Sequence, residues 1–367
     1  MAIEPIEGFL CPAAELSAYI SDLLQAAGAD VPSATATARA VVDASSRGVD
    51  THGVRLVPWY IRGVEGGRVN LRPNVSFTRK AAAVGHVDAD DGLGHRASFL
   101  AIEEGMAMAR ESGIAAITVG RSGHHGASGV YSLAAARAGF AAMAMTQADP
   151  AVVPFDGIKP FYGTNPISFA VPAPGEEPML LDMATSAIPY NRIFLRQATG
   201  TPLPPDVALT PEGEATVDPF RATGLRPLGG ANFGYKGAGL AAMVDILCSA
   251  FSGMGHAGTI PPLAGEDYSK PIPIGHFFLV MMPATFQALA SFDARIGAFL
   301  ADLRAQPATP GRAVLAPGDV EKAEAARRAV DGIPVDRVTW AALSASAERY
   351  GRHVPEARPT EGNRRDA

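Results

Sequence analysis

The stretch Ser46-Arg47-Gly48-Val49-Asp50-Thr51-His52-Gly53 places a cation, a carboxylate, a hydroxyl and an imidazole within eight residues, just after an expected helix. Gly48 and Gly53 allow backbone angles that other residues avoid, so these side chains can point into a cleft rather than a core. Imidazole has a pKa near neutrality, which suits His52 to exchange a proton with a substrate. A helix C-terminus with solvated polar side chains explains the same residues, and the sequence leaves both interpretations open.

Composition limits the class of protein and its partners. The chain has 367 residues, of which 47% are hydrophobic, enough for a large core and two domains. Charged residues make up 19%, the net charge is -6, and aromatic residues make up 7%. Because no basic cluster stands out, we expect no nucleic-acid partner.

The cysteines and the apolar stretches indicate where the protein resides. Cys11 and Cys248 lie far apart and form neither a disulfide framework nor a zinc ligand set, which fits a reducing compartment. The N-terminus carries acidic residues and no apolar run, unlike a signal peptide. The most apolar stretch, from Gly237 to Gly253, contains Asp245 and is too short for a bilayer span. We therefore expect a soluble cytoplasmic protein without membrane contact.

Apolar periodicity and turn residues predict helices at both chain ends and most strands between them. Helices are expected at 12–27, 33–46, 57–64, 95–109, 130–138, 285–303, 322–330 and 338–350, with Ser33 as the N-cap of the second. Strands are expected at 81–87, 114–119, 141–146, 167–171, 179–182 and 276–282. Residues 198–227 are expected to form a surface loop, and residues 356–367 a disordered tail.

A second histidine pair, His124-His125, lies in a glycine-rich turn between an expected strand and helix. Such turns carry function in many α/β proteins. Adjacent histidines diverge and no third ligand follows at a suitable spacing, so we expect no metal site. His52 with one of this pair would suit proton transfer and polarisation of a carbonyl group. A loop histidine held by backbone groups is the alternative.

Asp182 ends an expected apolar strand. A carboxylate at that position can orient a histidine and stabilise its cationic form. It can equally cap the turn that follows, and the sequence does not separate the two roles.

Two glycine-rich stretches offer phosphate sites. Gly234-Tyr235-Lys236-Gly237-Ala238-Gly239 precedes an expected helix from Leu240 to Ser252, and backbone N–H groups with a lysine suit an anion, although the Walker spacing is missing. Gly92-Leu93-Gly94-His95-Arg96-Ala97 matches the dinucleotide fingerprint, but the next strand ends in Gly120-Arg121 rather than an acidic residue. A glycine-rich loop before a core helix is the plain alternative for the first stretch.

Five motifs together resemble one family. They are the Arg47–Gly53 stretch, Ser122-Gly123-His124-His125-Gly126-Ala127, Tyr162-Gly163-Thr164-Asn165-Pro166, Asp182-Met183-Ala184-Thr185-Ser186 and Tyr235-Lys236-Gly237-Ala238-Gly239. Over residues 10–350 they look like the malate/L-lactate dehydrogenase family that lacks a Rossmann fold. Residues 147–155, Gln-Ala-Asp-Pro-Ala-Val-Val-Pro-Phe, look most like its ureidoglycolate dehydrogenase branch.

The resemblance implies an α/β, non-Rossmann dehydrogenase fold. A mostly antiparallel sheet domain, residues 76–299, would bind the cofactor, and a largely helical domain would come from both chain ends, residues 1–75 with 300–355. It implies an NAD- or NADP-dependent oxidoreductase, usually a homodimer, that acts on a small 2-hydroxy or 2-oxo acid. It also argues against the Gly92 motif as the pyrophosphate site.

Motif positions carry the family's site residues over to this chain. His52 matches a proton donor of some members, and His124 the catalytic histidine of the ureidoglycolate branch. Asp182 matches a charge-relay aspartate and, with Met183 and Ala184, a turn that contacts the cofactor. Further matches to cofactor contacts are Lys236, Gly237, Gly318 and Ala148, the last at a position where the branch has serine.

One departure concerns the substrate. Many members have an arginine four residues after the first histidine, where this chain has Leu56. Arg55 is therefore the candidate that holds the substrate carboxylate, with Thr51 and Arg47 as further substrate-binding candidates.

The sequence predicts reversible hydride transfer at C2 of a malate-, lactate- or ureidoglycolate-type acid, with His52 or His124 exchanging the proton and Asp182 supporting the imidazolium. A reductase of a cyclic imino acid is the alternative within enzymes. A nucleotide-binding protein without catalysis is the alternative outside them.

Overall fold

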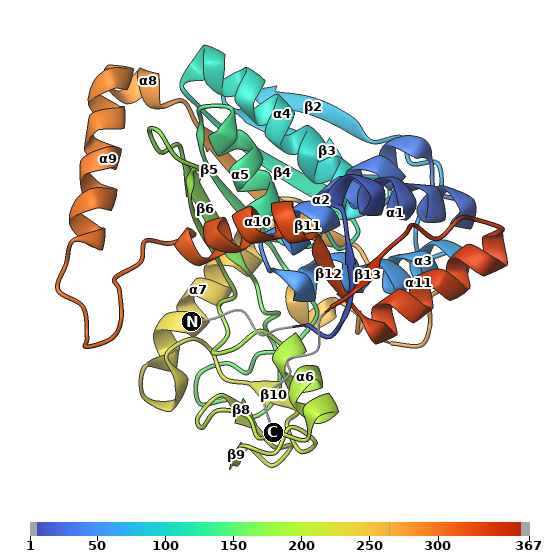
Figure 1. Cartoon of the computed structure of the whole chain (residues 1–367). Helices are drawn as coiled ribbons and strands as arrows, with labels where there is room; N and C mark the ends of the chain where they lie inside the picture. The colour runs from blue at the N-terminus through green and yellow to red at the C-terminus, as the bar shows by residue number, and fades with distance from the viewer. Residues whose placement is uncertain (1–5, 264, 361–367) are drawn as a thin grey trace.

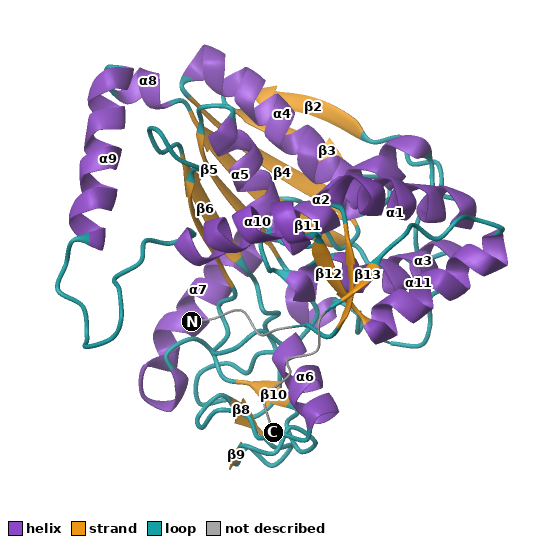
Figure 2. Ribbon diagram, in the orientation of Figure 1, coloured by secondary structure: helices purple, strands orange, loops and turns teal. Residues whose placement is uncertain are grey.

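The computed structural model describes residues 6–263 and 265–360 (Figure 1). Its centre is a seven-stranded sheet in the order β2-β3-β4-β11-β5-β6-β7. Neighbouring strands run antiparallel except β3 and β4, which are parallel. The mostly antiparallel sheet in an α/β fold was predicted and is confirmed (Figure 2). The strands are β2 (Ser76–Ala81), β3 (Val84–Asp88), β4 (Ile114–Ser122), β5 (Ala141–Thr146), β6 (Ile167–Val171), β7 (Met179–Met183) and β11 (Ile274–Met281).

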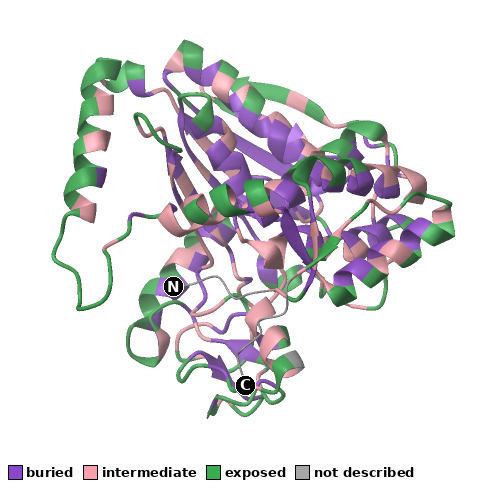
Figure 3. Ribbon diagram, in the orientation of Figure 1, coloured by how far each residue is buried: buried purple, intermediate pink, exposed green. Residues whose placement is uncertain are grey.

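Helices cover both faces of this sheet, as the alternation along β5 shows. Ala142 and Ala144 belong to the apolar cluster with α4 (Gly94–Ser112) and α5 (Gly129–Arg137). Met143 and Met145 belong to the cluster with α7 (Gly230–Cys248). Successive strand side chains point to opposite faces, so α4 and α5 lie on one face and α7 on the other. The buried strands form the core seen in Figure 3.

A second core joins the two ends of the chain. The helices α1 (Ala13–Ala27), α2 (Val31–Ser46), α3 (Val57–Gly66) and α11 (Arg337–Tyr350) pack together around it. Strand β1 (Gly8–Cys11) pairs with β12 (Ile333–Asp336) on one side and with β13 (Arg358–Pro359) on the other. The expected disorder from residue 356 is therefore wrong at β13, because pairing with β1 satisfies its backbone. Residues 361–367 lie outside the described residues.

The start of α2 differs from the prediction. Asp30, not Ser33, is the N-cap, and its carboxylate accepts a hydrogen bond from the Ser33 N–H at 3.1 Å. Pro32 lies in the first helical turn, where backbone N–H groups have no partner within the helix, so its missing N–H costs no helical hydrogen bond. The helix therefore begins before the proline.

Two other segments differ from expectation because very short elements give no periodic signal. The expected strand at 81–87 is a hairpin of β2 and β3. Residues 198–227 include the end of α6 (Asn191–Thr199) and three two-residue strands, β8 (Ala208–Leu209), β9 (Ala215–Thr216) and β10 (Gly224–Leu225). They enclose a small apolar cluster with Val152 and Ile193.

The predicted helix at 285–303 is divided into α8 (Pro283–Phe286) and α9 (Leu289–Arg304). Helix α9 extends away from the rest of the chain, and most of its surface is exposed (Figures 1 and 3). Helix α10 (Asp319–Asp331) then returns the chain toward α2.

The expected glycine loop at 234–239 lies inside α7, which begins at Gly230. A Cβ on Gly237 would lie 2.4 Å from the backbone N and O of Leu228, so the glycine permits close packing of helix against chain. Lys236 is exposed on this helix, with its Nζ 5.3 Å from the centroid of the Phe233 ring. The prediction of a loop at a helix start is therefore wrong.

Within residues 6–263 and 265–360, no helix is long and apolar enough to cross a bilayer. The same residues contain no group of three or more histidine, cysteine or acidic side chains arranged to hold a metal ion.

Candidate active site

A cavity of about 730 Å³ lies where the helical core meets the sheet. Its walls come from segments far apart in the sequence, at residues 49–59, 124–128, 148–151, 164–166, 182–184, 189–194 and 260–263. His52, His124 and Asp182 line it together, as do Thr51, Ala148, Met183 and Ala184. A cleft of this size between two cores is a usual site for a small molecule.

The two glycines that flank the first motif act differently. Gly48 has φ +81°, in the left-handed region that favours glycine. Gly53 has φ -102°, so it is not left-handed, although its ψ of -139° lies outside the regions that other residues favour. A Cβ on Gly53 would lie 2.1 Å from Ser45 Oγ, and this oxygen accepts a hydrogen bond from Val54 N–H at 3.0 Å. Gly53 is needed for close approach to α2.

A side chain from the C-terminal part holds this motif in place. Arg328 on α10 is 2% exposed and binds both carboxylate oxygens of Asp50, at 2.6 and 2.9 Å. It also donates to the Ser45 carbonyl at 2.6 Å. Burial raises the pKa of Asp50, although Arg328 acts in the opposite direction. The loop that carries His52 is therefore anchored from a helix 278 residues away in sequence.

His52 and His124 face each other across the cavity. Their ring centroids are 6.1 Å apart, and the ring planes differ by 22°. The Nδ1 of His52 lies 3.0 Å from Thr51 Oγ1. His125, in contrast, is buried between Ser98 and Ser128, with hydrogen bonds of 3.1 and 3.0 Å. Of the second pair, only His124 reaches the cavity.

The contacts of His124 determine its tautomer. Its Nδ1 accepts a hydrogen bond from the Gly126 N–H at 3.2 Å and lies 2.8 Å from the buried Tyr60 hydroxyl. A nitrogen that accepts an N–H bond carries no proton, so the neutral ring is protonated at Nε2. Burial lowers the pKa of His52 to about 4 and lowers that of His124 well below its usual value. Both imidazoles are therefore neutral at neutral pH.

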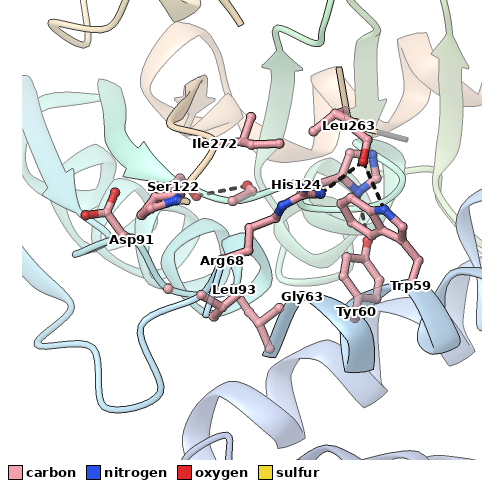
Figure 4. Close-up of a pocket in the computed structure, with 14 residues that line it drawn as sticks. Trp59, Tyr60, Gly63, Arg68, Asp91, Leu93, Ser122, His124, Leu263 and Ile272 are labelled. Atoms are coloured by element: carbon pink, nitrogen blue, oxygen red, sulfur yellow. Dashed lines mark hydrogen bonds between the residues drawn. The ribbon is translucent and has the colours of Figure 1, made fainter. Parts of the chain in front are cut away.

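Leu263 closes the cavity beside His124 and is held from three sides. Its carbonyl accepts hydrogen bonds from Trp59 Nε1 at 3.1 Å and from the Arg68 guanidinium at 3.0 Å. Its N–H donates to Asp149 at 3.0 Å. Figure 4 shows Trp59 and Arg68 converging on Leu263, with Tyr60 below His124, in a smaller pocket on the far side of this wall.

Asp182 is held at the start of α5. Its Oδ2 accepts a hydrogen bond from Gly129 N–H at 2.9 Å. Burial raises its pKa to about 6, while the charge of Arg47 lowers it. Among the described residues it makes no hydrogen bond to an imidazole, and its carboxylate caps the N-terminus of α5, not the turn that follows Asp182.

The structure places several candidate residues outside this cavity. Arg47 is buried and paired with Asp43 at 2.7 Å, and Arg55 is exposed, whereas Leu56 lines the cavity. Lys236 and Gly237 lie on α7, and Gly318 lies against Leu180 of β7.

The Gly92 motif supports the second histidine turn. Helix α4 begins at Gly94, where a Cβ would lie 2.2 Å from the Gly123 carbonyl oxygen. The motif glycines thus permit backbone packing next to His124.

Sequence reasoning missed Trp59, Tyr60, Asp149 and Leu263 as site residues. The Trp59-Tyr60 pair was a usable signal, since two aromatic residues follow the first motif closely. Leu263 carried no such signal, because its role rests on its backbone.

Comparison with known proteins identifies the chain. A solved malate dehydrogenase structure from Pyrococcus horikoshii OT3 superposes with a TM-score of 0.86 at 28% identity, covering 96% of this chain and 99% of that one. The structure of a delta1-piperideine-2-carboxylate reductase from Pseudomonas syringae pvar. tomato superposes with a TM-score of 0.83 at 25% identity, covering 92% of this chain and 99% of that one. In sequence, ureidoglycolate dehydrogenase (NAD(+)) of Escherichia coli K12 is 30% identical over 321 residues, 87% of this chain and 90% of that protein.

The mostly antiparallel sheet and this structural similarity thus define a dehydrogenase fold that differs from the Rossmann fold. The model of the malate/L-lactate dehydrogenase family matches residues 11–344, and the chain belongs to this family. It is an NAD(P)-dependent oxidoreductase of hydroxy acids, as predicted.

Proposed function

We propose that the chain transfers a hydride between NAD or NADP and C2 of a small 2-hydroxy or 2-oxo acid, with His52 as the group that exchanges the proton. The observation that carries this assignment is the pair of donors on His124 Nδ1. Because His124 then presents a protonated Nε2, it donates a hydrogen bond to the substrate oxygen and does not accept the proton.

His52 is free for the other role. Thr51 Oγ1 lies 3.0 Å from His52 Nδ1, and we assign the ring proton to Nδ1 with the hydroxyl as its acceptor, which leaves Nε2 unprotonated. In the oxidative direction the hydroxyl proton passes to this Nε2, while hydride leaves C2. The lowered pKa of His52 favours the neutral, proton-accepting form at neutral pH. In reduction, the same nitrogen returns the proton to the oxygen.

The cofactor, when bound, accepts or supplies the hydride. The cavity volume and its partly apolar walls fit a nicotinamide group. We propose that Asp182, Met183, Ala184 and Ala148 hold it, within a cofactor-binding unit of residues 76–299. Two of the outlying candidates flank the 182–184 turn: Gly318 lies against Leu180, and Gly237 against Leu228, whose N–H donates to the Thr185 carbonyl. Lys236 lies next to Gly237.

Replacing the histidines separately tests these roles. His52→Ala should lower kcat by about a hundredfold or more, the usual scale for a positioned acid or base. His124→Gln keeps an N–H donor and should retain about tenfold more activity than His124→Ala, whereas His52→Gln should not improve on His52→Ala. Equal activity of the two His124 variants, or near-normal turnover of the His52 variants, would contradict the assignment.

The similarity to a delta1-piperideine-2-carboxylate reductase favours a second candidate function, reduction of a cyclic imino acid. The same His52 would then protonate nitrogen instead of oxygen. Nicotinamide absorbance with a cyclic imine and with 2-oxo acids separates the two reactions. Cofactor binding without turnover of either would favour a binding protein instead.

We also propose a homodimer in the cytoplasm. The extended segment of α8 and α9 exposes Phe286, Leu289 and Phe299, at 65%, 51% and 55%. Apolar side chains on an extended arm support association with a second copy. Cys11 and Cys248 are free and buried, which suits a reducing compartment. Light scattering of the purified chain tests the dimer, and a monomeric mass would contradict it.

A further inference from the structure

The charge of the main cavity bears on its substrate. No arginine or lysine occurs among the described residues that line it, whereas Asp149 and Asp182 both do. His52 and His124 are neutral at neutral pH, because burial lowers the pKa of each. Among the described residues, those that line the cavity therefore offer an anion no formal positive charge.

The wall next to His124 is apolar. Trp59 and Leu263 form it, and the apolar Leu56 also lines the cavity. The Trp59 ring meets the His124 ring edge-on, with centroids 5.7 Å apart. The polar atoms of this wall are already bound, since Trp59 Nε1 donates to the Leu263 carbonyl and Leu263 N–H donates to Asp149. The wall therefore presents carbon atoms to a ligand.

The nearby cation Arg68 does not line the main cavity. It lies in the smaller pocket behind Leu263 and donates to the backbone carbonyls of Leu263 and Asp267 (Figure 4). Its guanidinium carbon Cζ lies over the Tyr268 ring, 4.1 Å from the ring centroid. Its hydrogen bonds thus hold the wall in place.

We propose that the substrate has a single carboxylate and an apolar group on C3, which packs on Leu56, Trp59 and Leu263. This inference rests on the proposed function and specifies its substrate class. An apolar group gains from leaving water for a carbon-lined wall. A second anionic group would be desolvated beside two aspartates, with no described cation lining the cavity to pair with it, which is unfavourable.

Turnover on paired substrates tests this inference. With oxidised cofactor, we expect kcat/KM for 2-hydroxy-4-methylpentanoate and 3-phenyllactate to exceed that for malate and 3-sulfolactate by about tenfold or more, the scale of a few buried carbon groups. Faster turnover of malate or sulfolactate overturns the inference and leaves the proposed function intact. Turnover of no hydroxy acid overturns both.

Variants at Leu56 give an independent reading. Leu56→Arg should shift the ratio of kcat/KM at least tenfold toward malate. Leu56→Gln has similar size without the charge, and it should weaken the apolar acids without favouring malate. Val338→Arg adds the same charge at a position that is 80% exposed on α11, and the ratio should not change. If Leu56→Arg folds and the ratio of kcat/KM for malate and the apolar acids is unchanged, the inference is also overturned. If this variant does not fold, the comparison of substrates with the wild-type protein still tests the inference.

Discussion

Tyr60→Phe removes one oxygen atom and tests whether Tyr60 positions His124. The Tyr60 hydroxyl lies 2.8 Å from His124 Nδ1, and the residue is 2% exposed. The ring itself packs edge-on against His95, with centroids 4.9 Å apart, and phenylalanine keeps that packing. The substitution therefore deletes a hydrogen bond and little else.

The expected size follows from the bond. A buried hydrogen bond contributes about 1 kcal/mol net, and about 1.4 kcal/mol corresponds to a factor of ten. The variant should thus lose about fivefold in kcat if the whole bond acts on the reacting geometry. The hydroxyl donates to the neutral ring, so its loss should also raise the pKa of His124 toward its usual value and move the acidic limb of the pH profile upward.

Tyr19→Phe is the matched control. The Tyr19 hydroxyl donates to the Leu343 carbonyl at 2.9 Å, and the residue is 6% exposed in the helical core. Both variants should lose about 1 kcal/mol in the free energy of unfolding, measured with urea. Only Tyr60→Phe should change kcat and its pH profile, followed by nicotinamide absorbance. Equal kcat values for the two variants would refute the positioning role.

Three further predictions concern the framework of the site. Burial raises the pKa of Asp182 to about 6 in the folded protein, compared with about 3.9 in the unfolded chain. The folded state therefore binds the proton more readily, and the free energy of unfolding falls as the pH rises between these two values. Asp182→Asn should remove this pH dependence. Measured with urea, the free energy of unfolding of the variant relative to the wild type should therefore rise by about 2 kcal/mol between pH 4 and pH 6. A difference between the two proteins that does not change with pH would contradict this prediction. Arg328→Met leaves the Asp50 carboxylate without its cation and should lower the free energy of unfolding by about 3 kcal/mol. The double variant Arg328→Met/Asp50→Asn should recover part of this stability, because it no longer buries an unpaired charge. If the double variant is no more stable than Arg328→Met, the loss does not come from this ion pair. Gly53→Ala places a Cβ against Ser45 Oγ and should lower the free energy of unfolding by about 1–3 kcal/mol and also lower turnover. The control Gly139→Ala, at an exposed position with φ +89°, should lower the free energy of unfolding through backbone strain but leave turnover unchanged.

The regular elements could be predicted because their apolar periodicity is local. The strands at 141–146 and 167–171 have the predicted bounds, since each is a short apolar run between turns. Motifs likewise identified His52, His124 and Asp182 as candidates, and all three line one cavity. That information resides in residue types and their spacing along the chain.

Contacts between distant segments were decided only by the tertiary structure. The glycines at 234–239 suggested a loop, yet they lie within α7, where Gly237 packs so closely on the Leu228 backbone that no side chain fits. Arg328 anchors Asp50, the Tyr60 hydroxyl contacts His124 Nδ1, and the Leu263 backbone closes the cavity. Such pairs depend on how the chain ends and the sheet come together, so no spacing along the sequence encodes them. The sequence by itself determined the family and the paired histidines; the fold decided which groups face the substrate and in which protonation state.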